Sequence, residues 1–169
     1  STVRTTLSYA SNKVIKNIAN LKLLPNFYYD DIFGTVVNRF LVQAVLGYPL
    51  TVYGNGNQKR GYINLIDSLS CIELALKNPP ENGMRILNQF TETFTINQLA
   101  NKIKKAAKNF DIKVKIKSVK NPRIEKERHY YNPKFTGLKK LGLKPTLMTE
   151  KVLIDMLHLV KKYKDQINH

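Results

Sequence analysis

The chain has 169 residues, of which 43% are apolar and 24% are charged, and this is enough for one domain with a hydrophobic core. That apolar fraction excludes a disordered chain, and 8 Gly with 7 Pro exclude a collagen-like one. The sequence holds 28 Lys plus Arg against 12 Asp plus Glu, so its net charge is +16 and an anionic partner is favoured.

Helical and strand periodicities alternate along the chain. Apolar residues that recur every three or four positions predict amphipathic helices, and short alternating or continuous apolar runs predict strands. In chain order, we expect a basic helix over 8–24, a helix over 36–45, strands over 50–53 and 60–66, a helix over 67–76, a strand over 85–90, a helix over 95–107, a strand over 112–119 and a closing helix over 149–160.

Small polar residues mark where three of these helices begin. Asp67 or Ser68 can cap the helix that runs to position 76. Thr95 and Gln98 have the spacing of a capping box, in which a hydroxyl and an amide satisfy two backbone N–H groups reciprocally. Thr149 is the predicted cap of the closing helix.

The alternation of helices and strands favours an α/β or α+β domain. The helix near Ile72 and the strand near Ile86 have the pattern of elements that pack on a larger sheet, yet only about four strands are recognisable. We therefore expect part of the usual sheet to be absent from this chain, so that apolar surface is exposed at Ile72 and Ile86. Finding both residues buried within the monomer would contradict this interpretation.

One segment has the residues of a nucleotide site. A strand end at Thr51–Tyr53 can offer backbone N–H and C=O groups to a flat heterocycle, and Arg60 at the start of the next strand can bind a diphosphate with its guanidinium fork. The alternative interpretation is a plain β-hairpin with an exposed cation. Gly54 and Gly56 do not make a dinucleotide fingerprint, because position 59 is Lys and a strand is predicted to follow.

Six segments resemble, in order, the C-terminal half of the extended short-chain dehydrogenase/reductase enzymes, the NAD-dependent epimerase/dehydratase family that acts on nucleotide sugars. The strand and Arg60 pattern is typical of the whole superfamily, whereas the first, fourth and fifth segments resemble its sulfolipid-forming members. The segments are Tyr29–Phe40, Gly47–Gly54, Arg60–Ile63, Asn88–Glu92, Asn121–Arg123 and His129–Asn132.

This resemblance implies an α/β fold, namely the C-terminal substrate-binding portion of an extended short-chain dehydrogenase/reductase with the N-terminal Rossmann core missing. Residues 1–24 are then a variable N-terminal segment, and residues 25–169 form the nucleotide-sugar-binding domain. The chain begins with Ser1 instead of Met, so we expect it to be part of a longer protein. The resemblance also implies a homodimer for the complete enzyme.

The resemblance implies a reaction as well. Sulfolipid-forming members oxidise UDP-glucose at C4 with bound NAD, remove water across C5 and C6, add sulfite at C6 and return the hydride to give UDP-sulfoquinovose. NAD is thus a recycled cofactor, bound by the missing N-terminal half. A different epimerase or dehydratase of the same family remains the alternative, and sulfite dependence separates the two.

Residue by residue, the resemblance places the uracil on Thr51, Val52 and Tyr53, largely through their backbone groups. Arg60 and Arg123 would clamp the diphosphate, each with charge-assisted hydrogen bonds of about 1.5–3 kcal/mol.

Further substrate contacts follow from the same resemblance. Either Glu125 or Glu127 would accept a hydrogen bond from a ribose hydroxyl. Arg39 also lies in a matching segment, but it falls on the polar face of its helix, and we expect a solvated or structural role for it. The residues that would line the rest of the substrate pocket are Tyr29, Gly34, Thr35 and Val36.

The catalytic residues of this family form a Tyr-x-x-x-Lys pair with a partner Thr. Tyr9 and Lys13 have that spacing, and a Lys beside a Tyr lowers the pKa of the phenol. Too few residues separate Lys13 from Phe33 to hold the strand and loop that normally intervene, so we interpret the pair as a chance match. We expect no catalytic or cofactor-binding residues in this chain, and no activity from it alone.

Other kinds of site find little support. A nucleic-acid-binding module using the lysines of 102–120 is a second possibility, but the segment lacks interleaved aromatic residues for base stacking, so we consider a nucleic-acid partner unlikely. The three histidines have no metal-ligand spacing.

The sequence also argues against a membrane span and against a disulfide framework. No apolar run approaches the ~20 residues that cross a bilayer, so we expect a soluble protein without a membrane partner. The single cysteine, Cys71, excludes an intramolecular disulfide framework and is predicted to be a buried thiol. The expected location is the cytoplasm, or the plastid stroma in a photosynthetic eukaryote.

Overall fold

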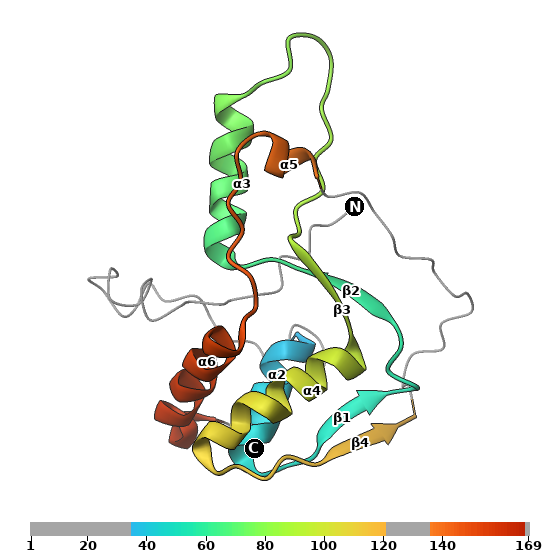
Figure 1. Cartoon of the computed structure of the whole chain (residues 1–169), viewed down its shortest axis with the longest axis vertical. Helices are drawn as coiled ribbons and strands as arrows, with labels where there is room; N and C mark the ends of the chain where they lie inside the picture. Colours follow the sequence, from blue (N-terminus) through green and yellow to red (C-terminus); the bar gives the residue numbers. More distant parts are fainter. Residues whose placement is uncertain (1–34, 121–135, 168–169) are drawn as a thin grey trace.

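The computed structural model describes residues 35–120 and 136–167, with helices and short strands alternating along these segments (Figure 1). The elements are α2 (Val36–Leu46), β1 (Leu50–Tyr53), β2 (Lys59–Tyr62), α3 (Leu65–Lys77), β3 (Glu92–Thr95), α4 (Ile96–Ala107), η2 (Lys108–Phe110), β4 (Ile116–Val119), α5 (Gly137–Lys140), α6 (Glu150–Lys162) and η3 (Lys164–Gln166). The described residues therefore have the mixed helix and strand content that the sequence predicts.

The strands of the described residues form two separate two-stranded sheets. β1 pairs with β4 in parallel, with Leu50 opposite Ile116, while β2 pairs antiparallel with β3, with Tyr62 opposite Glu92. β1 and β2 are consecutive but do not pair with each other, so the hairpin interpretation is wrong. Instead, β2 pairs with β3, and the turn in which Gly54 and Gly56 adopt left-handed conformations leads the chain from one sheet into the other.

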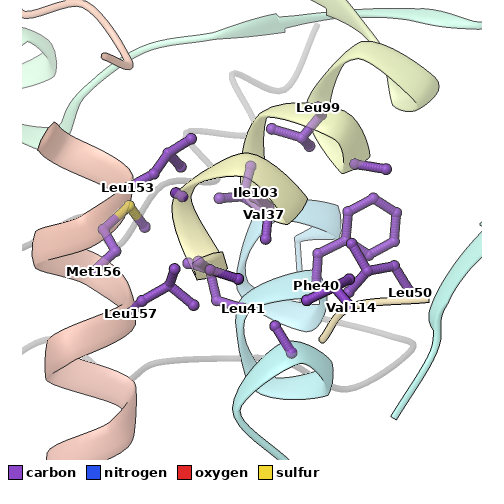
Figure 2. Close-up of a cluster of buried hydrophobic side chains, with 14 of the residues drawn as sticks. Val37, Phe40, Leu41, Leu50, Leu99, Ile103, Val114, Leu153, Met156 and Leu157 are labelled. Carbon is purple, nitrogen blue, oxygen red and sulfur yellow. The ribbon is translucent and has the colours of Figure 1, made fainter. Parts of the chain in front are cut away.

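The main core lies among α2, α4, α6 and β1. α2 presents one apolar face, with Phe40 and Leu41 fully buried, and Gly47 ends it in the left-handed conformation as a C-cap. Figure 2 shows side chains from the three helices meeting there with Leu50 and Val114. Other members of this core, all buried, are Val37, Leu99, Ile103, Leu153, Met156 and Leu157.

A second, smaller core joins α3 to α5 at the opposite end of the molecule (Figure 1). Ile63, Cys71, Leu138 and Leu143 are its buried members. The burial of Cys71 confirms the prediction made for this thiol, and burial also raises its pKa, which keeps it in the unreactive protonated form.

Two of the three predicted helix starts are confirmed. Thr95 and Gln98 form the complete capping box of α4, and the hydroxyl of Thr149 accepts the N–H of Val152 at the start of α6. The cap of α3 is Asn64, whose side chain accepts the N–H of Ile66, so the prediction of Asp67 or Ser68 is wrong. The cap lies three residues before Asp67, because Asn64 is an equally good capping residue.

Strand bounds differ more from the predictions. The predicted strand over 60–66 ends at Tyr62, since Asn64 already caps α3, and the one over 112–119 is reduced to Ile116–Val119, where β1 supplies a partner. The strand predicted over 85–90 is wrong: this segment carries no strand hydrogen bonds among the described residues. A strand needs a neighbour to pair with, and sequence periodicity does not supply one.

The predicted apolar surface is present. Ile72 on α3 is 54% exposed and Ile86 in the following segment is 78% exposed. Leu69, Leu76 and Met84 are exposed beside them in the sequence. The fold thus has the unpaired apolar elements expected of a chain whose sheet continues elsewhere.

The helix predicted over 8–24 and the boundary predicted between residues 24 and 25 lie outside the described residues. Within 35–120 and 136–167, no helix is both long enough and apolar enough to span a lipid bilayer.

Candidate functional site

The outer edge of β1, on the side away from β4, is held by two side chains of α2. Gln43 makes a two-point contact with Thr51: its Nε2 donates to the Thr51 hydroxyl at 2.8 Å, and its Oε1 accepts the Thr51 N–H at 3.0 Å. Arg39 lies one helical turn earlier and donates from Nη2 to the Thr51 carbonyl at 3.0 Å. Thr51 is therefore fixed by α2 at its backbone N–H, its carbonyl and its hydroxyl.

Arg39 also packs on the next side chain of the same edge. Its guanidinium carbon lies 4.3 Å from the centre of the Tyr53 ring, within cation–π distance. The Tyr53 carbonyl in turn accepts a hydrogen bond from Gln58 Nε2 at 3.0 Å. Of the two roles expected for Arg39, the structural one describes these contacts, and it connects α2 to the predicted uracil-binding segment.

The turn after β1 is docked on the start of α4. The Asn97 N–H donates to the Gly56 carbonyl at 3.0 Å, and Asn97 Nδ2 donates to the Asn55 carbonyl at 2.8 Å. Gly56 has a φ of +70° and no room for a side chain, because a Cβ there would lie 2.6 Å from Val52 Cγ1. This turn sets the direction in which the chain enters β2 and hence the place of Arg60.

Arg60 is an exposed residue of β2 that faces Phe94 across the ladder, and its Nη1 donates to the Lys59 carbonyl at 3.0 Å. Its proposed partner, Arg123, lies outside the described residues, so the two-arginine clamp stays a prediction.

The remaining predicted site residues fall into two groups. Within the described residues, Thr35 is the N-cap of α2, Val36 packs against the main core, and the Val52 side chain is fully buried. The backbone N–H and carbonyl of Val52 face β4 in the parallel ladder. The others lie outside the described residues: Tyr9, Lys13, Tyr29, Gly34, Glu125 and Glu127.

A second polar cluster was not predicted from the sequence. Asp67 Oδ2 accepts the N–H of Thr146 at 2.7 Å, and Glu92 Oε1 accepts the N–H of Met148 at 2.6 Å. Lys102 Nζ donates to the Met148 carbonyl at 3.1 Å. These bonds attach the segment between α5 and α6 to α3, β3 and α4 (Figure 1).

Burial dominates the electrostatics of this cluster. Asp67 is 2% exposed, and loss of water around its carboxyl raises its pKa although the Thr146 N–H bond opposes the rise. Burial likewise raises the pKa of Glu92, against the hydrogen bond from Met148 and the charge of Lys102. The contacts join residues 79 and 56 positions apart, and no spacing rule in the sequence indicates them.

A small cavity lies beside Glu92. Its other lining residues include Tyr62, Asn64, Thr146 and Met148. The Tyr62 side chain is 7% exposed, its hydroxyl has no hydrogen-bond partner among the described residues, and burial raises its pKa above the usual value. The space is of the size that holds a single water, so it is too small for a nucleotide sugar.

The described residues do not fit a dinucleotide cofactor. A dinucleotide fingerprint needs a glycine-rich turn that opens a helix, whereas the turn with Gly54 and Gly56 leads into strand β2 and is closed by Asn97. Within 35–120 and 136–167, no group of three His, Cys, Asp or Glu side chains is arranged to hold a metal ion.

Sequence comparison identifies close relatives. No protein-family model matches the chain. It is 47% identical over 148 residues to the chloroplastic UDP-sulfoquinovose synthase of Spinacia oleracea, covering 87% of this chain and 31% of that protein. It is 46% identical over 131 residues to the UDP-sulfoquinovose synthase of Sulfolobus acidocaldarius, covering 77% of this chain and 33% of that protein. The chain thus spans about a third of the length of both relatives.

Solved structures with a similar fold include UDP-sugar epimerases. Pal from Bacillus thuringiensis superimposes with a TM-score of 0.64 at 25% identity, covering 89% of this chain and 50% of its own. UDP-glucose 4-epimerase from Thermotoga maritima, solved with UDP-glucose, has a TM-score of 0.60 at 25% identity, covering 81% and 44%. UDP-N-acetylglucosamine 4-epimerase from Methanobrevibacter ruminantium has a TM-score of 0.64 at 19% identity, covering 85% and 43%.

The sequence resemblance and the superpositions point to one family, and they agree that only part of a longer enzyme is matched. The chain is similar in sequence to about a third of a UDP-sulfoquinovose synthase, and its fold is that of the substrate-binding portion of the extended short-chain dehydrogenase/reductases, the NAD-dependent epimerase/dehydratase family.

Proposed function

We propose that this chain is the UDP-sugar-binding part of a UDP-sulfoquinovose synthase, which converts UDP-glucose and sulfite to UDP-sulfoquinovose. The single observation that carries the proposal is the identity of 46–47% to two proteins of that name over most of this chain. Solved relatives bound to UDP-glucose or to UDP-glucuronic acid support a UDP-sugar as the ligand.

The described geometry supports the same role. β1 presents an edge that α2 holds in place, and Arg60 follows one turn later on an exposed strand. A fixed strand edge suits a flat base, and a guanidinium suits a diphosphate, which it can grip with two parallel hydrogen bonds. The net charge of +16 favours the approach of an anionic nucleotide.

NAD, sulfite and a homodimer belong to this proposal for the complete enzyme. Several structural relatives were solved with NAD, which supports its use in the family. Since the described residues offer no dinucleotide fingerprint and the spacing from Lys13 to Phe33 marks the Tyr9–Lys13 pair as a chance match, we expect NAD and the catalytic residues to be supplied by the remaining two-thirds of the enzyme. The location stays a prediction, cytoplasm or plastid stroma, although the name of the spinach relative places that protein in the chloroplast.

Binding of UDP-glucose to the full chain tests the proposal directly. Arg60→Ala should weaken binding about tenfold or more, because one charge-assisted contact to the diphosphate is lost. The matched control is Lys59→Ala, which removes the neighbouring exposed cation of β2 and should change affinity little. Equal losses in the two variants would show that charge alone is responsible. Tight binding of mixed DNA or RNA that falls steeply with salt would favour a nucleic-acid-binding module instead.

Activity provides a second test. The chain incubated with UDP-glucose, NAD and sulfite should show no turnover, and turnover at a normal enzymatic rate would contradict the assignment. Joining the chain to the remaining portion of the spinach relative should restore sulfite-dependent formation of UDP-sulfoquinovose.

One alternative within the family is favoured by a specific observation. The Thermotoga maritima structure at 25% identity is a UDP-glucose 4-epimerase, so a 4-epimerase is the second candidate. The joined protein would then convert UDP-glucose to its 4-epimer without sulfite. The sulfite requirement therefore separates the two candidates.

A further inference from the structure

Residues 54–58 connect two strands that belong to different sheets (Figure 1). β1 pairs with β4 and β2 pairs with β3, and no ladder bond joins β1 to β2 among the described residues. Tyr53 at the end of β1 and Arg60 near the start of β2 therefore lie on separate sheets. We call residues 54–58 the connecting turn. The contacts that hold this turn affect how the two strand ends are placed relative to each other.

Two hydrogen bonds fix the shape of the connecting turn from within. Gln58 Nε2 donates to the Tyr53 carbonyl at 3.0 Å, which brings the two ends of the turn together. The N–H of Asn57 donates to Asn55 Oδ1 at 3.0 Å, as in an Asx turn. Both bonds lie within residues 53–58, so neither of them attaches the turn to the rest of the fold.

Asn97, the second residue of α4, supplies that attachment. Its Nδ2 donates to the Asn55 carbonyl at 2.8 Å and lies 3.4 Å from Asn57 Oδ1. Its backbone N–H donates to the Gly56 carbonyl at 3.0 Å. Because a carbonyl oxygen only accepts, the Asn97 amide must point its nitrogen at Asn55. Gly56 lets the amide approach, since a Cβ at this position would lie 2.6 Å from Asn97 Cγ.

The attachment joins the connecting turn to the strand pair that carries Arg60. Arg60 lies opposite Phe94 in the β2–β3 ladder, and β3 runs directly into α4, where Asn97 follows. From Asn97 the side-chain amide reaches back to Asn55, in the turn that leads to Arg60. This closed ring of contacts fixes the end of β1 relative to Arg60, and the Asn97 amide is its one side-chain link between α4 and the Asn55 carbonyl among the described residues.

We propose that Asn97 is a positioning residue of the nucleotide site, whose amide holds the connecting turn and thereby the placement of Arg60 relative to the Tyr53 end of β1. The inference rests on the proposed UDP-sugar function and adds to it a residue of α4 that acts through the turn. A ligand that contacts both sides of a turn binds best when the two sides are held in place beforehand, because ordering them on binding costs affinity.

A double-mutant cycle tests this coupling with UDP as the probe and titration calorimetry on the full 169-residue chain. Asn97→Ala removes the side-chain bond to the turn and should weaken UDP binding about fivefold. In the Arg60→Ala background the same change should have little further effect, because the group that Asn97 positions is gone. Asn101→Ala is the matched control, since Asn101 is an exposed asparagine one helical turn later on α4, and it should leave the affinity unchanged.

Hydrogen exchange gives a readout that needs no ligand. The amide proton of residue 97 is donated to the Gly56 carbonyl, so it is protected only while the connecting turn stays docked on α4. Its protection should fall in Asn97→Ala, whereas the amide proton of Ile103, in the interior of α4, should exchange as in the wild type. Unchanged protection of residue 97 would overturn the inference, because the turn would then stay docked without the side-chain amide.

The binding outcomes separate the inference from the proposed function. If the wild-type chain binds UDP but Asn97→Ala has no effect, or weakens binding by the same factor with and without Arg60, then Asn97 does not act through Arg60. The inference then fails while the proposed function stands. If the wild-type chain does not bind UDP, the proposed function fails and the inference fails with it.

Discussion

At the scale of single residues, Asp67 is the clearest case of a buried carboxyl that stabilises a distant segment. Its side chain is 2% exposed and accepts the Thr146 N–H at 2.7 Å. Asp67→Ala removes the acceptor and leaves this N–H without its partner, and should lower the free energy of unfolding by about 1–3 kcal/mol. Urea denaturation of the two proteins measures the difference.

Asp67→Asn is the informative control. The amide oxygen can still accept the Thr146 N–H while no charge is buried, so stability should be unchanged or higher. A loss as large as that of Asp67→Ala would mean that the negative charge itself is required, for example at the first turn of α3, where a helix dipole favours an acid.

The pH dependence of stability follows from the same carboxyls. Burial raises the pKa of Asp67 and of Glu92 in the folded protein, so the folded state binds protons more readily than the unfolded state between the two pKa values of each group. Their contribution to stability must therefore increase as the pH falls through the folded pKa toward the ordinary carboxyl value. Acid should not release the segment at Thr146 and Met148 through these groups.

Thermal melting from pH 7 down to pH 4 checks this sign. The difference in Tm between wild type and Asp67→Asn should shrink as the pH falls, because the wild-type carboxyl becomes neutral as well. A difference that widens on acidification would contradict the assignment.

At the scale of elements, the turn between β1 and β2 depends on one glycine. Gly56 has a φ of +70°, and a Cβ there would lie 2.6 Å from Val52 Cγ1 and closer still to the Asn97 side chain. Gly56→Ala should cost about 2 kcal/mol or more in unfolding free energy, since backbone strain adds to the clash. Gly54→Ala is the matched control, because its φ is +65° and nothing lies within 4 Å, so strain of about 1 kcal/mol acts alone. Equal losses would show that Asn97 and Val52 move aside freely.

The elements also show what the sequence could predict. The capping box at Thr95 and the cap at Thr149 are local, within three residues, and both were predicted correctly. The strand predicted over 85–90 is wrong, because pairing depends on a neighbour that the described residues do not supply. β3 was missed because Phe94 is the single apolar residue in Glu92–Thr95, which leaves no apolar pattern to recognise.

In the candidate site, too, local features were predicted from the sequence and long-range contacts were not. Thr51–Tyr53 and Arg60 were singled out by a compact motif, and the structure places them on β1 and on β2, which follows it. The roles of Gln43 and Asp67 depend on contacts 8 and 79 residues apart, which no periodicity reports. These two contacts can be recognised only in the folded structure, where α2 lies beside β1 and the segment that joins α5 to α6 lies beside α3.

At the scale of the whole molecule, the exposed apolar stripe of α3 is the feature that most needs a partner. Leu69, Ile72 and Leu76 follow one another at helical spacing, and Ile86 in the next segment is also exposed. We expect the rest of the enzyme to cover this stripe. Leu76→Lys should leave the stability of this chain within about 0.5 kcal/mol, because the side chain is already exposed, but should abolish the activity of the protein joined to the remaining portion of the spinach relative.

Leu147→Lys serves as the matched control, since Leu147 is an exposed leucine of the segment between α5 and α6. It should leave the activity of the joined protein unchanged. Full activity of the Leu76→Lys protein would mean that the stripe stays in contact with water in the complete enzyme.

The parallel pairing of β1 with β4 has a consequence for how the chain folds. Leu50 lies opposite Ile116, so the ladder closes only after the whole intervening stretch, with α3 and α4, has been drawn together. Closing a long loop costs entropy before the contact returns any free energy, and such non-local pairings slow folding. Packing of α4 against α2 shortens the distance that must be bridged. During refolding, helical circular dichroism should therefore recover before the proposed nucleotide affinity does, and the β1–β4 ladder should be among the last features to form.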